Sequence, residues 1–253
     1  MKITFLGTGT SQGVPIIACP CGICNSPNPK DKRLRSSVMI ENKGKVMVID
    51  TGPDFRQQML RENVKRLDAV IFTHAHKDHL AGFDDIRAFN YVLQKKIEVY
   101  ADSVVQKAIR REFSYIFEEV KYPGIPEINL HTINKKPFLI EETGFIPIRL
   151  MHHRLPILGF RVGDFTYMTD ANYISDEEKE KVKGSKIIVL NALRREPHIS
   201  HFTFEQAIEL MKELNPPKAY FTHISHQLGL HDEVEKELPE FISLAYDGLK
   251  IEL

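Results

Sequence analysis

Short apolar runs and amphipathic segments alternate along most of the chain. In the first half, runs of apolar and β-branched residues predict strands at residues 3–6, 38–40, 45–49, 69–72 and 97–100. Apolar positions that recur every three to four residues predict helices at residues 55–62, 82–93 and 103–119. The first half is therefore predicted to be rich in strands, with helices between them.

The second half has clearer element boundaries. The dipeptide Gly163-Asp164 separates two apolar runs and predicts a hairpin of residues 160–162 and 165–168. Ser175 begins a capping box that opens a short helix, and a second box at Thr203 opens a helix that a pair of prolines ends. Further strands are predicted at residues 145–150, 187–190 and 219–221. This alternation predicts an α/β fold.

A histidine-rich segment follows directly after the predicted strand at residues 69–72. Its pattern H-x-H-x-D-H places three imidazoles and one carboxylate at His74, His76, Asp78 and His79. Zinc, manganese and iron all accept these ligand types. His74 and His76 alternate as on an extended chain, whereas the other two are adjacent and point in different directions, which indicates two metal positions. A solvated histidine-rich turn is the simple alternative.

Further residues able to bind metals follow predicted strands elsewhere in the chain: His153, Asp170 and His223. In α/β proteins, ligands gather at the carboxyl ends of the strands. We therefore expect these three residues to converge with the histidine segment on one edge of the sheet.

All three cysteines lie within six positions, in the pattern C-x-C-x-x-C at Cys19, Cys21 and Cys24. This spacing lets the thiolates converge on one ion, and one imidazole would complete a closed, structural zinc site. The surrounding loop, at about residues 16–35, is rich in Pro, Asn, Lys and Asp and needs such a staple to stay ordered. Free thiols or a redox pair remain the alternative.

Composition bounds the remaining possibilities. The chain has 253 residues, 42% of them hydrophobic, which is enough for a full core, and we expect residues 1–253 to form a single domain. Lys plus Arg and Asp plus Glu are 34 each, so no overall charge favours nucleic acid or an anionic membrane. The first residues lack a long apolar segment, and no apolar stretch approaches 18 residues, so we expect a cytoplasmic protein without a membrane partner.

The order of these residues, with Asp50 at the end of an early strand, resembles the metallo-β-lactamase superfamily. That resemblance implies a four-layer αββα sandwich with a dinuclear metal site. Residues 7–15, the cysteine pattern after them and the sequence T-H-I-S-H-Q at 222–227 are similar to a narrower branch, the phosphoribosyl cyclic phosphodiesterases of the carbon–phosphorus lyase pathway. Members of this branch are usually homodimers.

The resemblance implies a role for each residue able to bind metal. One active-site metal is held by His74, His76 and His153. The second is held by Asp78, His79 and His223, and Asp170 bridges the two metals. The fourth ligand of the cysteine zinc matches His226, with His152 and His231 as competitors for that position.

The expected catalytic and substrate-binding residues lie in two segments, the histidine-rich segment and the loop that ends at His201. His201 matches the catalytic histidine of the resembled branch and precedes a capped helix, and Asp78 is counted with it as catalytic. Arg194 and Arg195 lie in the same loop as His201 and could bind a substrate phosphate in bidentate fashion. A solvated basic pair is an equally good interpretation of the two arginines.

These features together predict a metal-dependent hydrolase that acts on small, cyclic phosphodiesters through a metal-bound hydroxide. The two active-site ions could be manganese, zinc or iron, because the ligand types do not choose among them. Alternatives are an accessory protein like the B protein of pyrroloquinoline quinone biosynthesis, a thioester hydrolase, and an RNA-processing nuclease. A large RNA substrate is disfavoured because only 16 residues separate His153 from Asp170 and the net charge is zero.

Overall fold

Two β-sheets form the centre of the protein in the computed structural model, which describes residues 1–120 and 123–253. The first sheet has the order β15 (Lys250–Glu252), β1 (Lys2–Gly7), β2 (Ser37–Asn42), β3 (Lys45–Ile49), β4 (Ala69–Ile71), β5 (Ile97–Ala101) and β6 (Ile128–Thr132). The second has the order β11 (Tyr173–Ile174), β8 (Thr143–His152), β9 (Leu155–Val162), β10 (Phe165–Tyr167), β12 (Ile187–Asn191), β13 (Lys218–Thr222) and β14 (Ile242–Leu244), with β7 (Phe138–Ile140) paired to β8.

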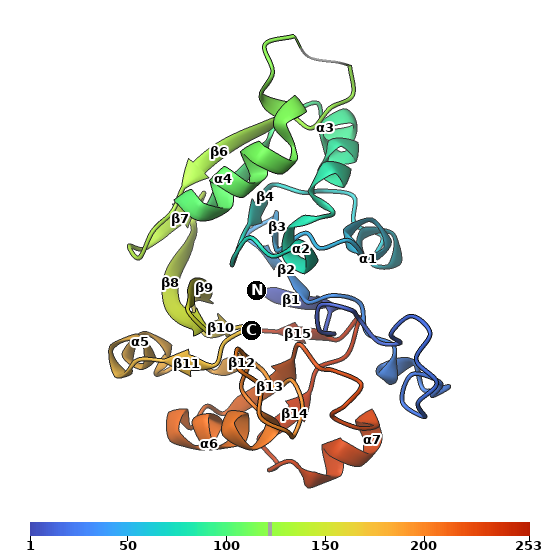
Figure 1. Cartoon of the computed structure of the whole chain (residues 1–253). Helices are drawn as coiled ribbons and strands as arrows, with labels where there is room; N and C mark the ends of the chain where they lie inside the picture. The colour runs from blue at the N-terminus through green and yellow to red at the C-terminus, as the bar shows by residue number, and fades with distance from the viewer. Residues whose placement is uncertain (121–122) are drawn as a thin grey trace.

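Helices cover the outer face of each sheet (Figure 1). The first sheet carries α1 (Phe55–Arg61), α2 (Lys77–Leu80), α3 (Arg87–Leu93) and α4 (Ser103–Glu112). The second carries α5 (Asp176–Val182), α6 (Phe204–Leu214) and α7 (His231–Val234). Short 3₁₀ turns occur at η1 (Pro29–Asp31), η2 (Phe83–Ile86), η3 (Ser114–Phe117) and η4 (Glu235–Glu237). The predicted αββα sandwich is confirmed.

Three layers of apolar side chains hold the sandwich together. One cluster lies between the sheets and includes Phe5, Phe160 and Tyr167. The other two lie between each sheet and its helices, with Val70 under the first set of helices and Phe221 under the second. A strand such as β4 is buried on both faces, which explains why it reads in the sequence as an unbroken apolar run.

Parallel pairing brings the functional segments to one edge. Strands β3 to β6 are mutually parallel, as are β10, β12, β13 and β14. Their carboxyl ends therefore lie at the same edge of each sheet, where crossover loops leave the strands. The histidine segment, Asp170 and His223 all follow such ends.

Two sequence predictions of helices need correction. The segment 82–93 is divided into η2 and α3, and the segment predicted as one helix at 103–119 ends as α4 at Glu112, followed by η3. The ring of Phe113 packs on Phe83, with centroids 5.4 Å apart, so tertiary packing of an aromatic side chain ends the helix before its apolar periodicity does. The predicted hairpin around Gly163-Asp164 is confirmed by the pairing of Val162 with Phe165.

No helix in the part of the chain that the structure describes combines the length and the apolar character needed to cross a lipid bilayer.

Candidate metal centre

Three histidine rings meet where β4 and β8 end. The rings of His74 and His76 have centroids 4.6 Å apart, and the ring of His152 lies 4.9 Å from that of His76 and 5.7 Å from that of His74. His74 is buried, and its Nε2 has no hydrogen-bond partner among the described residues. A buried ring nitrogen without a partner is costly unless an ion binds it. The three imidazoles are therefore suited to holding one metal.

The sequence-based choice of His153 as a ligand is wrong. His153 lies in the turn between β8 and β9 with φ of 56°, and its side chain is exposed. The Nδ1 of His152 lies 2.6 Å from the carbonyl oxygen of Asp170 and 3.0 Å from that of Ser200, so this nitrogen donates and Nε2 is left to face the other rings. β8 ends at His152, and the turn directs the next side chain to solvent.

Replacing each of the two adjacent histidines by alanine tests this correction. We expect His152→Ala to weaken binding of one active-site metal by more than about 100-fold, because losing a residue that only supports a ligand already costs about 10- to 100-fold. His153→Ala is the matched control and should bind metal as the wild type does. Titration of the metal-free proteins with Mn²⁺, followed by calorimetry, measures both affinities; equal losses in the two variants would contradict the assignment.

A second group of possible ligands surrounds the carboxylate of Asp170. Ligand atoms of Asp78, His79, Asp170 and His223 all lie within 4.8 Å of one another. The Nε2 of His79 is 3.2 Å from Asp78 Oδ2 and 3.3 Å from Asp170 Oδ2, and Asp170 Oδ2 is also 3.2 Å from the Nδ1 of His223. Ligand atoms of His152, Asp170 and His201 form an overlapping group, so Asp170 lies beside both His152 of the first cluster and the residues of the second. It occupies the place of a bridging ligand.

Carboxylates and imidazoles in this region shift one another's pKa. Burial alone would raise the pKa of Asp170, but His223 and His79 hold it well below the usual value. Burial alone would lower the pKa of His79, but the carboxylates of Asp170, Asp78 and Asp50 raise it well above the usual value. A buried carboxylate needs a cation or hydrogen-bond donors beside it. Two divalent ions would satisfy this requirement, and the fully buried His79 Nε2, which lacks a hydrogen-bond partner among the described residues, points at the same space.

Asp50 supports the second cluster without joining it. Its Oδ2 accepts hydrogen bonds from His79 Nδ1 at 2.7 Å and from the Thr73 hydroxyl at 2.7 Å, and its Oδ1 accepts from the Thr73 amide at 2.8 Å. Burial raises the pKa of this carboxyl group, and these hydrogen bonds and His79 oppose the rise. Asp50 thus fixes the tautomer of His79 so that Nε2 is free for a metal. Its place at the end of β3 is the signal visible in the sequence.

His201 lies where the two clusters meet. Its ring centroid is 4.7 Å from that of His152 and 4.8 Å from that of His223. The side chain is buried, and its Nδ1 has no partner in the described part of the chain. Burial, together with His223, lowers the pKa of His201 to about 2, so the imidazole is neutral. A neutral imidazole at this position can donate an N–H to a bound anion.

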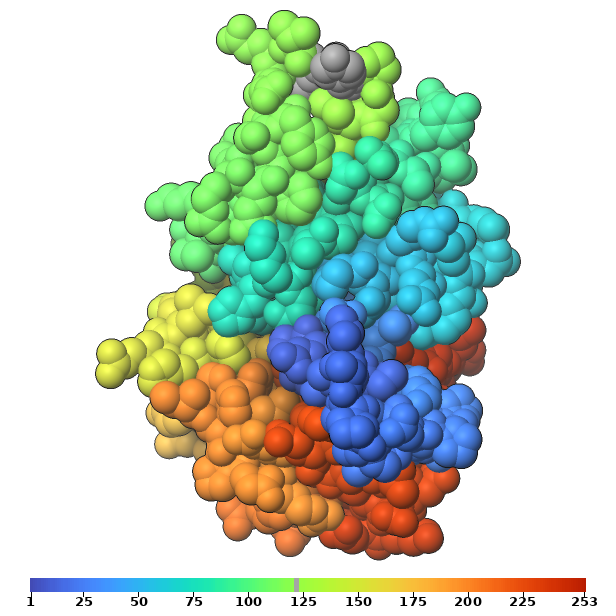
Figure 2. Space-filling model, turned by 45° about the vertical axis from the view of Figure 1, so that its right-hand side comes forward, coloured from blue at the N-terminus to red at the C-terminus, as the bar shows by residue number. Residues whose placement is uncertain are grey.

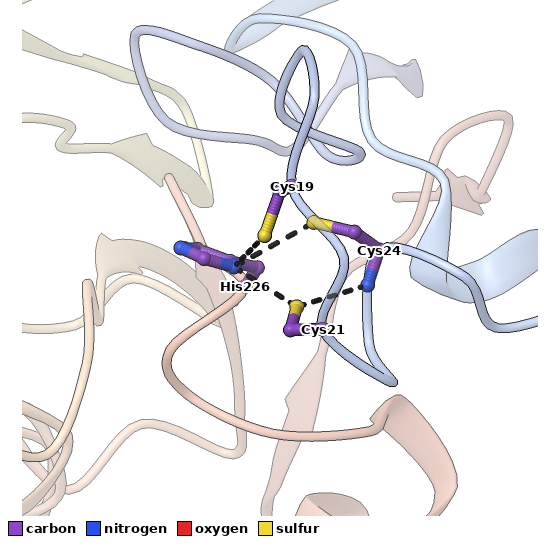
Figure 3. Close-up of side chains that lie close together, drawn as sticks. All are labelled: Cys19, Cys21, Cys24 and His226. Carbon is purple, nitrogen blue, oxygen red and sulfur yellow. Dashed lines mark hydrogen bonds between the residues drawn. The ribbon is translucent and has the colours of Figure 1, made fainter.

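The three cysteines converge on His226 (Figure 3). His226 Nδ1 is 3.5 Å from Cys19 Sγ, 3.2 Å from Cys21 Sγ and 3.5 Å from Cys24 Sγ. Zn–S bonds of about 2.3 Å and a Zn–N bond of about 2.0 Å in a tetrahedral site would separate nitrogen and sulfur by about 3.5 Å. The four side chains therefore fit a structural zinc ion.

The thiols differ in how readily they ionise in the absence of an ion: burial raises the pKa of Cys24 to about 11, whereas Cys21 is shifted the other way. A hydrogen bond from the Cys24 amide and the neighbouring His226 lower the pKa of Cys21 to about 6, which favours the thiolate that zinc requires. The two competitors for the fourth position lie elsewhere: His152 in the metal centre, and His231 with its Nδ1 3.0 Å from Arg33 Nη2.

The cysteine loop is joined to the C-terminal half. Ile224 donates its amide to the carbonyl of Thr8 at 2.9 Å, and the side chain of Asp247 accepts from Thr8 N at 3.0 Å and from Leu34 N at 2.8 Å. Figure 2 shows the blue N-terminal segment packed against the orange and red C-terminal half. Because His223 and His226 are three residues apart, a zinc ion at the cysteines would brace the segment that carries an active-site histidine.

The two arginines expected to bind substrate are instead held by neighbouring protein groups. Arg194 donates to Gln227 Oε1 at 2.8 Å and to the carbonyl of Pro197 at 3.0 Å. Arg195 donates to both carboxylate oxygens of Glu237, at 2.7 and 2.8 Å, and its guanidinium lies 5.0 Å from the centre of the Phe204 ring. These contacts fasten the loop before His201 to the segment 227–237. They favour the interpretation of the pair as structural, and substrate binding by Arg194 and Arg195 stays a prediction.

Comparison with known proteins agrees with the observed fold. Residues 46–224 match the family model described as the beta-lactamase superfamily domain. A solved structure described as a new diphosphatase from the PhnP family has a TM-score of 0.94 and 38% identity, and the alignment covers 100% of this chain and 97% of that one. Zinc-bound PqqB from Methylobacterium extorquens has a TM-score of 0.79 over the full length of both chains, but at 16% identity it shows the shared fold alone.

Two curated relatives carry other names. An octanoyltransferase of Porphyromonas gingivalis is 40% identical over 99% of this chain and 51% of its own length. A ribonuclease Z of a Nostoc species is 27% identical over 65% of this chain and 47% of its own length. The chain thus spans about half the length of each of these relatives.

Proposed function

We propose, from the premise that this chain belongs to the beta-lactamase superfamily and within it to the PhnP family, that it is a dinuclear-metal hydrolase of small phosphodiesters. The observation that carries the proposal is the position of His201, which is buried and lies against His152 of one ligand cluster and His223 of the other. It places a proton-bearing group beside the space where an ester bound to the metals would lie.

Different residues of the chain would bind the metals, orient the attacking oxygen and donate a proton. We assign one metal to His74, His76 and His152, the other to Asp78, His79 and His223, and the bridge to Asp170. When bound, the ions, for which manganese, zinc and iron are candidates, supply a hydroxide near neutral pH and stabilise charge on the phosphoryl oxygens. Asp78, whose Oδ2 lies 3.2 Å from His79 Nε2, would help to hold the second ion and to orient the attacking oxygen. As a neutral imidazole, His201 would donate an N–H hydrogen bond to the substrate. The negative charge of a bound diester raises the pKa of His201, so that it would take up a proton and, as the imidazolium, pass it to the leaving oxygen and return to the neutral form.

Two features support a small substrate: the net charge of zero and the short connection at the site. β9 and β10 occupy most of the connection between His152 and Asp170, which leaves no long arm for a large RNA among the described residues. This favours a small diester, such as a cyclic one, over the ribonuclease alternative. The predicted homodimer and the cytoplasmic location stay predictions.

Hydrolysis of bis(p-nitrophenyl) phosphate in the presence of Mn²⁺ or Zn²⁺ tests the proposal. We expect turnover that a chelator removes, and we expect His201→Ala to lower kcat by about 10²- to 10⁴-fold while the metal content stays unchanged. Glu196→Ala, an exposed position in the same loop, is the matched control and should keep the wild-type rate. Absence of turnover with every divalent ion would exclude a phosphodiesterase of this type.

Acyl ester or thioester hydrolysis is the second candidate, and the similarity to a protein named octanoyltransferase favours it. The same preparation should therefore be assayed with p-nitrophenyl octanoate and an octanoyl thioester. Faster metal-dependent cleavage of these than of the phosphodiester would replace the first proposal with the second.

A further inference from the structure

Three residues of the metal centre adopt backbone conformations that L-amino acids rarely take. The φ angle is 66° at Asp50, 61° at Asp170 and 55° at His223. Each lies just beyond a strand, where the left-handed conformation turns the side chain over the edge of the sheet. Such a conformation costs about 1–3 kcal/mol and persists only where the surroundings hold it.

In each case the residue that follows is held by a hydrogen bond from its amide. The amide of Thr51 donates to the carbonyl of His79 at 2.8 Å, and the amide of Ile224 donates to the carbonyl of Thr8 at 2.9 Å. The amide of Ala171, which follows Asp170, donates instead to a side chain, Asn191 Oδ1, at 2.7 Å. The amides that follow Asp50 and His223 therefore bind backbone carbonyls, whereas the amide that follows Asp170 binds a side chain. The turn at Asp170 is also held by His152 Nδ1, which lies 2.6 Å from the Asp170 carbonyl oxygen, so Asn191 is one of several groups that fix it.

The position and burial of Asn191 allow it to make two hydrogen bonds to Ala171. It is the last residue of β12 and is completely buried, and its Nδ2 also donates to the carbonyl of Ala171 at 2.9 Å. The backbone pairing of β10 with β12 ends at Tyr167 and Val189. Beyond these residues the side-chain amide of Asn191 joins the two segments in place of backbone groups, because it uses one N–H as donor and its oxygen as acceptor.

The same carbonyl connects Asp170 to the catalytic loop. Ala171 O also accepts a hydrogen bond from the amide of Phe202 at 2.8 Å, and Phe202 follows His201. A shift of Ala171 would therefore disturb both the carboxylate of Asp170 and the loop that carries His201.

We propose that Asn191 is a positioning residue that holds the carboxylate of Asp170 between the two metal positions. This inference rests on the proposed metal centre. Asp170 Oδ2 lies 3.3 Å from His79 Nε2 and 3.2 Å from His223 Nδ1, and the Thr169 hydroxyl donates to it at 2.6 Å. A bridging carboxylate meets two ions at once, so a small displacement of its backbone weakens both bonds.

Substitutions at Asn191 test the role through metal affinity. Asn191→Leu keeps a similar volume but removes both hydrogen bonds. Asn191→Asp keeps the oxygen that accepts from the Ala171 amide, but it places a second carboxylate oxygen, which cannot donate, against the Ala171 carbonyl. We expect both variants to bind Mn²⁺ at the active site about 10- to 100-fold more weakly than the wild type. Calorimetric titration of protein freed of active-site metal measures this affinity. A colorimetric zinc assay after thiol modification should still find one zinc per chain.

Thr166→Val is the matched control. Thr166 lies on β10, is completely buried, and pairs its hydroxyl with Ser185 Oγ at 2.7 Å, so the substitution removes a buried polar contact on the same strand, four residues before Asp170. We expect a lower melting temperature for the metal-free control with unchanged Mn²⁺ affinity. If Asn191→Leu does not fold, Asn191→Asp answers the same question, because it preserves size and polarity.

The possible results separate this proposal from the one on which it rests. Variants at Asn191 that lose thermal stability but keep wild-type Mn²⁺ affinity would overturn the positioning role alone and leave the metal centre intact. Wild-type protein that binds no metal outside the cysteine cluster would overturn the proposed function, and the role of Asn191 with it.

Discussion

Replacing Asp170 by alanine is expected to lower the rate of phosphodiester hydrolysis by roughly a thousandfold or more. The carboxylate lies beside His152 of one ligand cluster and beside the residues of the other, so its loss would weaken the hold on both ions. The charge stabilisation that two ions supply is worth several kcal/mol, and about 1.4 kcal/mol corresponds to a tenfold change in rate. Mass-spectrometric metal analysis should show the loss of at least one active-site ion. The assay is turnover of bis(p-nitrophenyl) phosphate at saturating Mn²⁺.

Asp164→Ala serves as the control for this variant. Asp164 lies in the turn just before β10, and its exposed carboxylate pairs with Lys186 at 2.8 Å. Its loss should leave both rate and metal content at wild-type values. Asp170→Ala protein with two bound ions and a rate within tenfold of the wild type would show that Asp170 is no bridging ligand.

Replacing Cys21 by serine is expected to release the structural zinc and to destabilise the protein by about 3 kcal/mol or more. Structural zinc contributes its binding energy directly to folding, and here it would fasten the cysteine loop to the segment of His226. For a chain of this length the melting temperature should fall by roughly 6–12 °C. Differential scanning calorimetry measures the fall, and a colorimetric zinc assay should find one zinc fewer per chain.

Ile17→Ser is the control, and it tests whether any substitution in the cysteine loop would release zinc and lower the melting temperature. The Ile17 side chain is 94% exposed, so its replacement removes no packing, and the melting temperature should not change. Zinc content and melting temperature that stay the same in Cys21→Ser would show that the cysteine cluster is not a metal site.

The sequence by itself determined the chemistry of both clusters. The patterns H-x-H-x-D-H and C-x-C-x-x-C are local, and the ability of imidazole, carboxylate and thiolate to bind metal does not depend on the fold. The alternation of apolar runs and amphipathic segments likewise determined the α/β class, because burial on a strand and burial on one face of a helix leave different periods.

Only the tertiary structure decided which neighbouring residue acts. His152 and His153 are alike in chemistry, and the choice between them depends on where the β8–β9 hairpin turns, which the pairing of His152 with Leu155 sets. The sequence offers no partner for Arg194 and Arg195, and the fold supplies them from far along the chain, as Gln227 and Glu237. The part played by Asn191 depends on β12 lying beside β10. Side-chain type is a property of one residue, whereas direction and partners are properties of the packed chain, so the sequence supplied the ligands and the fold arranged them.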